Sequence, residues 1–152
     1  MFFEFGEFRV DVDVERTREF YKNHGKTVVE SCGCNSCRNY SKAIENASDK
    51  VKSFFDSLGL DLQKAAEAIY YPTDEKGVAD YSVIFHLVGT MDDSVDMYLS
   101  DEAKKIMYTR SIYELEENIK IGFTTNIILC PKDFPKPCIQ LELIARLPWV
   151  ID

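Results

Sequence analysis

A regular pattern of apolar residues between positions 36 and 58 predicts one long helix. Apolar side chains recur there every three or four positions, which forms one stripe along a helix, and charged side chains fill the opposite side. Asn35 or Ser36 can cap its start, and Gly59 directly after Leu58 is typical of a helix end. We therefore predict a helix over about Ser36–Leu58. Its stripe consists of Tyr40, Ile44, Ala47, Val51, Phe54 and Leu58.

Apolar and polar residues alternate strictly in two other stretches, which predicts strands with one face toward a core. These stretches are Phe8–Val14 near the start of the chain and Ile139–Leu147 near its end. Asp80–Gly89 is apolar on both faces, so it should lie at the centre of a sheet. Weaker patterns predict further extended segments and a short helix that Asp61 caps. The extended segments are Thr17–Tyr21, Lys26–Glu30, Tyr70–Tyr71, Ile106–Leu115 and Ile119–Phe123, and the short helix runs to about Glu67.

Together these elements predict an α+β fold with a mainly antiparallel sheet of about six strands packed against the Ser36–Leu58 helix. Tight turns between successive strands favour antiparallel pairing. The apolar stripe of the helix needs a broad surface to cover it, and a sheet is the simplest one. No strand–helix alternation, internal repeat or linker divides the chain, so residues 1–152 should form a single domain.

The charge balance narrows the range of partners. The chain carries 26 acidic and 18 basic residues, a net charge of −8, and its basic residues are scattered among acidic ones. This argues against nucleic acid and against an anionic membrane surface. No apolar run approaches the roughly 18 residues of a membrane span, and Met1–Phe5 lacks the basic start of a signal peptide. We therefore expect a cytoplasmic protein, where disulfides are rare.

The most concentrated chemical feature is a group of three cysteines at the start of the predicted helix. Cys32, Cys34 and Cys37 lie within six residues, and a helix N-terminus favours the thiolate form that binds metal. Zinc prefers thiolates in structural sites and takes four ligands, so these residues could supply three corners of a tetrahedron. The candidates for the fourth ligand are Cys138, which is the first choice, then Cys130 and His24.

A second hypothesis concerns thiol–disulfide exchange. Cys34-Asn35-Ser36-Cys37 is a Cys-x-x-Cys turn at a helix start, and in this respect it resembles the active turn of thioredoxin-like oxidoreductases. The resemblance implies Cys34 as the nucleophile, Cys37 as the resolving cysteine, and Pro137 in the place of that family's cis-proline. It covers only the turn and this proline, because the β-rich stretch between them departs from the thioredoxin order.

A third interpretation gives the cysteines no chemistry. Free cysteine behaves as a small apolar residue, so the three could pack, reduced and unligated, beneath the end of the helix. The sequence Cys-Gly-Cys-x-x-Cys-Arg-Asn-Tyr over residues 32–40, with Leu147-Pro148-Trp149-Val150 near the end, resembles small uncharacterised bacterial proteins. That resemblance implies no activity.

No sequence pattern indicates a catalytic site outside the cysteines. Nucleotide-binding and nucleophile-elbow motifs are lacking, and His86 lies within an apolar strand, where a hydrogen-bonded structural role is expected. We therefore favour a non-enzymatic domain that binds a protein partner or a small ligand, with the cysteines in a structural role and zinc as the possible cofactor. The alternative is a thiol–disulfide oxidoreductase.

Overall fold

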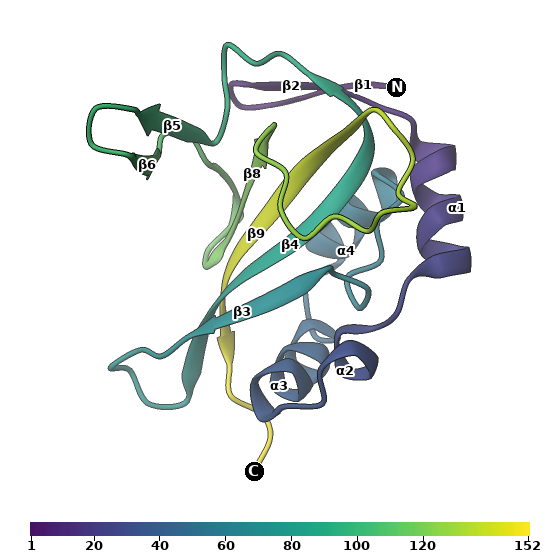
Figure 1. Ribbon diagram of the computed structural model, residues 1–152. Coiled ribbons are helices and arrows are strands. Elements are labelled where there is room, and N and C mark those ends of the chain that lie inside the picture. The colour runs from purple at the N-terminus through teal and green to yellow at the C-terminus, as the bar shows by residue number, and fades with distance from the viewer.

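The computed structural model describes all 152 residues and contains four helices and nine strands (Figure 1). The helices are α1 (Val14–His24), α2 (Val28–Ser31), α3 (Asn35–Ile44) and α4 (Asp49–Ser57). The strands are β1 (Phe2–Phe5), β2 (Phe8–Val12), β3 (Glu67–Tyr71), β4 (Val78–Met91), β5 (Tyr98–Asp101), β6 (Ile106–Thr109), β7 (Tyr113–Glu116), β8 (Ile119–Thr124) and β9 (Cys138–Pro148).

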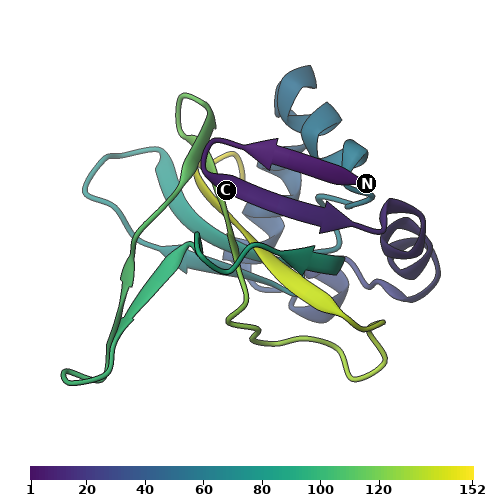
Figure 2. The ribbon, with the colours of Figure 1, turned by 90° about the horizontal axis from the view of Figure 1, so that it is seen from above.

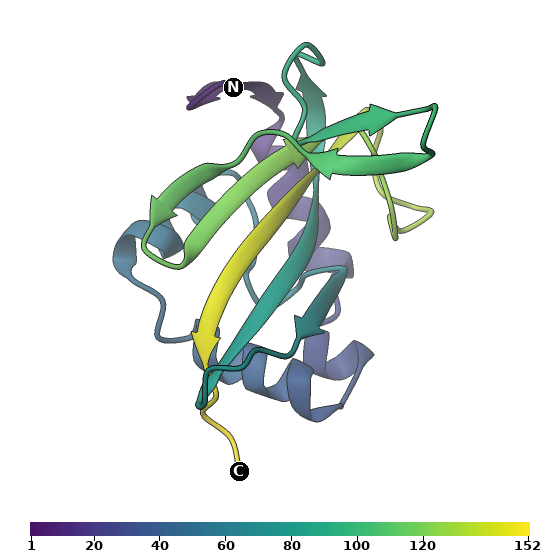
Figure 3. The ribbon, with the colours of Figure 1, turned by 90° about the vertical axis from the view of Figure 1, so that its left-hand side faces the viewer.

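The strands confirm the predicted α+β class with a mainly antiparallel sheet. The main sheet has seven strands in the order β1-β2-β4-β9-β8-β7, and β3 also pairs with β4. Strand β4 is central, as its apolar pattern predicts, and it pairs with β9 over eleven residues from Val78–Pro148 to Val88–Cys138. Figure 3 shows β8, β9, β4 and β3 side by side with the helices behind them. This long ladder fixes which residues lie at each end of the molecule.

Helix α1 completes the edge of β4 where no strand covers it. Strand β3 pairs with β4 as far as Ile84, and β2 begins to pair at Gly89, so the residues between them need other hydrogen-bond partners. The Tyr21 hydroxyl accepts a hydrogen bond from the His86 N–H (2.8 Å) and donates one to its carbonyl (2.7 Å). The Thr17 hydroxyl accepts from the Val88 N–H at 3.0 Å. A helix can therefore substitute for a missing strand here.

The predicted Ser36–Leu58 helix is interrupted and forms α3 and α4. The interruption comes at Ser48, whose extended backbone ends the helical path and whose hydroxyl accepts a hydrogen bond from the Val51 N–H. The apolar stripe nevertheless faces the sheet as expected, and Phe55 of α4 contacts Phe85 of β4 with ring centroids 5.3 Å apart. Both helices thus cover the same core, and Gly59 adopts the left-handed conformation (φ +82°) predicted for the end.

Three other sequence predictions are wrong, and in the first two of them local helix capping outweighs the extended pattern. Thr17–Tyr21 belongs to α1, where Asp13 accepts a hydrogen bond from the Arg16 N–H and caps the helix. Lys26–Glu30 contains the start of α2, which Thr27 and Glu30 close with a reciprocal capping box. Residues 61–67 form turns and the start of β3 instead of a short helix.

The predicted strand over residues 106–115 is two strands, and the first belongs to a separate hairpin. Strands β5 and β6 pair only with each other and extend away from the main sheet (Figure 2). The β5–β6 hairpin has its own exposed apolar side chains, Leu99, Ile106, Met107 and Tyr108. None of the four helices is both long enough and apolar enough to cross a bilayer.

The face of the sheet opposite α3 and α4 carries a chain of buried polar side chains. The His86 ring nitrogen Nε2 lies 2.9 Å from the Ile128 carbonyl and 3.2 Å from Gln140 Oε1. Gln140 donates in turn to Glu142 at 3.1 Å, and the Tyr98 hydroxyl donates to the other Glu142 oxygen. His86 is therefore the hydrogen-bonded strand residue that its apolar surroundings predict.

Acid should weaken the fold through His86. Burial lowers the pKa of His86, so the native state holds a neutral ring while the unfolded chain binds a proton below its ordinary pKa of about 6.5. The free energy of unfolding should thus fall as the pH drops below about 6.5, and level off below the lowered native pKa. Denaturant unfolding from pH 7.5 to 5 should show this slope in the wild type and in the control His24→Gln. The slope should be smaller in His86→Gln. An unchanged slope in this variant would show that His86 is not the source of the pH dependence.

Candidate functional site

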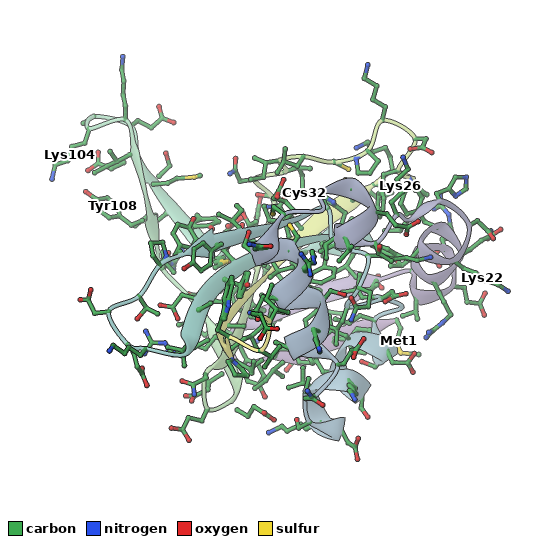
Figure 4. The ribbon with its side chains drawn as sticks, turned by 90° about the horizontal axis from the view of Figure 1, so that it is seen from below. Met1, Lys22, Lys26, Cys32, Lys104 and Tyr108 are labelled. Atoms are coloured by element: carbon green, nitrogen blue, oxygen red, sulfur yellow. The ribbon has the colours of Figure 1, made fainter.

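Two helix ends bring the three cysteines of the sequence motif together. Cys32 ends α2 and donates its backbone N–H to the Val28 carbonyl at 2.8 Å, whereas Cys34 is the residue that precedes α3. Cys37 is the third residue of α3. The Sγ atoms of all three lie within 4.8 Å of one another, and those of Cys32 and Cys34 are 3.2 Å apart. Figure 4 views this end of the molecule from below and labels Cys32. We call these three residues the thiol cluster.

The thiol cluster has a buried inner side and an open outer side. The Cys37 side chain is 2% exposed and packs beneath the start of α3, while Cys32 and Cys34 are exposed. Gly33, between the two exposed cysteines, has no positive φ, and a Cβ atom at this position would meet no atom within 4 Å apart from its two chain neighbours. The backbone at this position therefore does not require glycine. One sulfur is anchored in the core and two remain accessible to solvent.

Tyr81 and Asn39 fasten the start of α3 to the sheet and to the C-terminal segment. The Tyr81 hydroxyl on β4 donates to the Ser36 carbonyl at 2.7 Å. The fully buried Asn39 side chain donates to the Tyr81 hydroxyl and to the Pro148 carbonyl, both at 3.2 Å, and accepts from the Val150 N–H at 2.7 Å. The Cys-x-x-Cys-Arg-Asn-Tyr segment thus contacts the Leu-Pro-Trp-Val segment. Both segments stand out in the sequence, but neither indicates this role of Asn39.

Cys34 and Cys37 have opposite electrostatic environments. The Ser36 hydroxyl, 3.2 Å from the Cys34 sulfur, lowers the pKa of Cys34 to about 6, helped by the nearby Cys37 N–H and Cys32 thiol. Burial raises the pKa of Cys37 well above its ordinary range, and the neighbouring thiols of Cys34 and Cys32 raise it further. The accessible sulfur is therefore the better nucleophile and the easier one to deprotonate, whereas Cys37 needs a cation or another sulfur to replace its proton.

The structure does not bring the predicted fourth ligand, Cys138, to the thiol cluster. Cys138 lies opposite Val88 at the far end of the β4–β9 ladder, seven residues along β4 from Tyr81, which touches the start of α3. At about 3.3 Å per residue, this places Cys138 roughly 23 Å from the end that holds the cluster. In Figure 1 β9 begins in the upper part of the molecule, whereas helix α3 lies near the bottom. The predicted four-cysteine site that includes Cys138 is therefore not formed within the chain.

The other two candidates for the fourth ligand also lie outside the cluster. Cys130 neighbours Cys138 at the far end of the sheet, where burial raises the pKa of Cys130 to about 11. His24 ends α1 and stacks its ring on Phe20, with centroids 5.2 Å apart. Pro137 follows a cis peptide bond, as the thioredoxin-like resemblance implies, but it precedes Cys138 and so lies far from the Cys-x-x-Cys turn. The chain itself brings three donor side chains together.

The spacing of the three sulfur atoms fits a thiophilic metal ion. Zinc–sulfur bonds of about 2.3 Å at tetrahedral angles place bound sulfurs roughly 3.8 Å apart. The Cys32 and Cys34 sulfurs, at 3.2 Å, are about 0.6 Å closer than this value, and no pair of the three is more than 4.8 Å apart.

Comparison with known proteins adds no relative. No protein-family model, no curated protein and no solved structure matches this chain. The resemblance to small uncharacterised bacterial proteins therefore stays a prediction, and the thiol cluster is the feature that can indicate a function.

Removing the Asn39 side chain should destabilise the protein measurably. Asn39→Ala deletes three hydrogen bonds and leaves the Tyr81 hydroxyl with one partner fewer in the core. We expect a loss of about 1–3 kcal/mol in the free energy of unfolding, measured by urea denaturation. The control Asn35→Ala, which removes one exposed hydrogen bond to Arg38, should change stability by less than about 0.5 kcal/mol. Equal effects of the two substitutions would contradict the anchoring role of Asn39.

Proposed function

We propose that this protein is a non-enzymatic binding domain whose Cys32, Cys34 and Cys37 thiolates hold a thiophilic metal ion, with zinc as the first choice. The observation that supports this is the convergence of three Sγ atoms within 4.8 Å. Thiolates are the preferred structural ligands of zinc, and a cation at this position would offset the cost of deprotonating the buried Cys37. The metal would act on structure and not on a substrate.

A bound ion would cross-link the end of α2 to the start of α3. Helix α2 has four residues, and its last turn leads directly to Cys32, whereas Cys37 belongs to the anchored helix α3. Short helices are marginal without tertiary contacts, so a metal cross-link between residues 32 and 37 would hold α2 in place. We therefore expect metal removal to loosen residues 28–36 more than the sheet.

Binding of a macromolecular partner is supported by apolar side chains that the fold leaves uncovered. The β5–β6 hairpin exposes four large apolar residues and stands apart from the main sheet. An isolated two-stranded hairpin is marginally stable in water, so contact with another surface would stabilise it. Tyr71 at the end of β3 is likewise 52% exposed. We propose that this domain binds a protein partner or a small ligand.

Metal content tests the proposal directly. Protein purified under reducing conditions without added zinc should contain close to one equivalent of metal by plasma mass spectrometry. Cys32→Ser, Cys34→Ser or Cys37→Ser should each lower that content severalfold, because each removes a ligand. Cys138→Ser and Gly33→Ala should keep it, the first because the residue lies at the far end of the sheet, the second because Gly33 offers no ligand. Less than about a third of an equivalent in the wild type with intact thiols would count against the site.

A second candidate function is exchange with a disulfide in the metal-free protein. The contrast between the exposed Cys34 and the buried Cys37 favours it. Cys34 is exposed at the start of α3, and Cys37 lies buried beside it in the same thiol cluster. The Cys34 thiolate would attack one sulfur of a substrate RS–SR′, forming Cys34–S–S–R and releasing R′S⁻, which takes a proton from water. Cys37 would then attack the Cys34 sulfur and pass its proton to the leaving RS⁻. One disulfide is reduced as the Cys34–Cys37 pair is oxidised.

The pH dependence of Cys34 reactivity tests this second function. In metal-free protein, alkylation of Cys34 by iodoacetamide should rise with a midpoint near pH 6, because the Ser36 hydroxyl lowers its pKa to about 6. With oxidised glutathione, Cys37→Ser should trap a mixed disulfide on Cys34 that mass spectrometry detects, and Cys34→Ser should abolish it. Cys138→Ser is the control. A midpoint at the ordinary value, near 8.5, would remove this candidate.

A further inference from the structure

The thiol cluster supplies three ligands, and no fourth protein donor accompanies them. Among the His, Cys, Asp and Glu side chains, only Cys32, Cys34 and Cys37 form a group with donor atoms within 4.8 Å. His86 is 1% exposed and occupied by the Ile128 carbonyl and Gln140 within the sheet. A zinc ion takes four ligands in a tetrahedron, so an ion at this site would have one position that its own chain leaves open.

The open position is reachable from solvent. Two of the three ligands, Cys32 and Cys34, are exposed, and no residue other than these two neighbours lies within 4 Å of the place where a Gly33 side chain would begin. The buried Cys37 closes the opposite, inner side. A ligand that approaches from outside therefore needs no rearrangement of the core.

The surroundings of the thiol cluster accept an anionic ligand, although the chain as a whole is acidic. The first turn of α3 contains no acidic side chain, and Arg38 follows Cys37 directly. The N-terminus of the ten-residue helix α3 adds partial positive charge at the same place. The Ser36 hydroxyl, 3.2 Å from the Cys34 sulfur, offers a hydrogen-bond donor. Among anionic donors, a thiolate matches the softness of the three ligands already present.

We propose that the metal ion of the thiol cluster takes its fourth ligand from outside this chain, and that this ligand is a thiolate. This inference rests on the proposed metal-binding function. Binding exchanges a metal-bound water for the sulfur of an incoming thiol, RSH, and the thiol proton passes to solvent, so no oxidant or reductant is involved. The thiolate could belong to a small molecule or to a cysteine of another chain, and the two sources share this chemistry.

Cobalt(II) in place of zinc makes the number of thiolate ligands visible. The cobalt-loaded monomer should show sulfur-to-cobalt charge transfer for three thiolates, and saturating 2-mercaptoethanol should raise its intensity by about a third as a fourth thiolate binds. Ethanol, which offers oxygen in place of sulfur, should leave the spectrum unchanged. In the monomer, Cys138→Ser should behave as the wild type, because Cys138 lies at the far end of the sheet.

The number of thiolates bound to cobalt and the oligomeric state of the protein together identify the source of the fourth thiolate. If a second copy of the chain supplies it, sedimentation should show a metal-dependent dimer with a four-thiolate spectrum before any thiol is added, and 2-mercaptoethanol should convert this dimer to monomers. If the source is a small molecule, the protein stays monomeric throughout. Either result supports an external thiolate.

Two outcomes would overturn the inference while leaving metal binding in place. One is a cobalt spectrum that does not respond to 2-mercaptoethanol in a protein that binds one equivalent of cobalt. The other is a four-thiolate spectrum in a monomer without added thiol, since one of the chain's own remaining cysteines would then be the ligand. Failure to bind cobalt or zinc at all would instead refute the proposed function.

Discussion

The backbone hydrogen bonds that β4 must form on both of its edges determine how the rest of the molecule is arranged. A strand at the centre of a sheet has backbone groups on both edges that must find partners, and β9 satisfies one edge over eleven residues. The other edge is shared by β3, by the side chains of Tyr21 and Thr17 on α1, and by β2. Because α1 leads directly into α2 and the thiol cluster, the strand that holds the sheet together also determines where the cysteines lie.

The sequence was sufficient for features that depend on neighbours along the chain. The apolar run of β4, the alternation of β2 and β9 and the left-handed Gly59 all express local patterns, and each was predicted close to its observed position. The convergence of Cys32, Cys34 and Cys37 is of the same kind, since short-range geometry at a helix start brings them together. The interruption at Ser48 had a local signal as well, a cap followed by Asp49, but the continuous apolar stripe outweighed it.

Features that depend on strand register could not be predicted in this way. Placing Cys138 near the thiol cluster required knowing which β4 residue it faces, and the register puts it beside Val88 instead of Tyr81. The same ladder brings Pro148 and Val150 to Asn39, a contact across more than a hundred residues that neither segment indicates alone. Helix α1 was missed although Asp13 supplies a local cap, and the partners of its Tyr21 and Thr17 hydroxyls lie on a strand far along the chain.

The proposed metal site uses all three sulfur atoms and the proposed disulfide exchange uses two of them, those of Cys34 and Cys37, so the two functions compete. Coordination to a metal lowers the nucleophilicity of a thiolate toward a disulfide, and a Cys34–Cys37 disulfide would leave a metal with Cys32 alone. Burial of Cys37 favours the metal, because a divalent cation can replace its proton whereas water cannot solvate its charge. Exposure of Cys34 favours attack by or on external sulfur. An external thiolate on the metal reconciles these tendencies, since it uses the open side of the cluster without removing Cys37 from its place in the core.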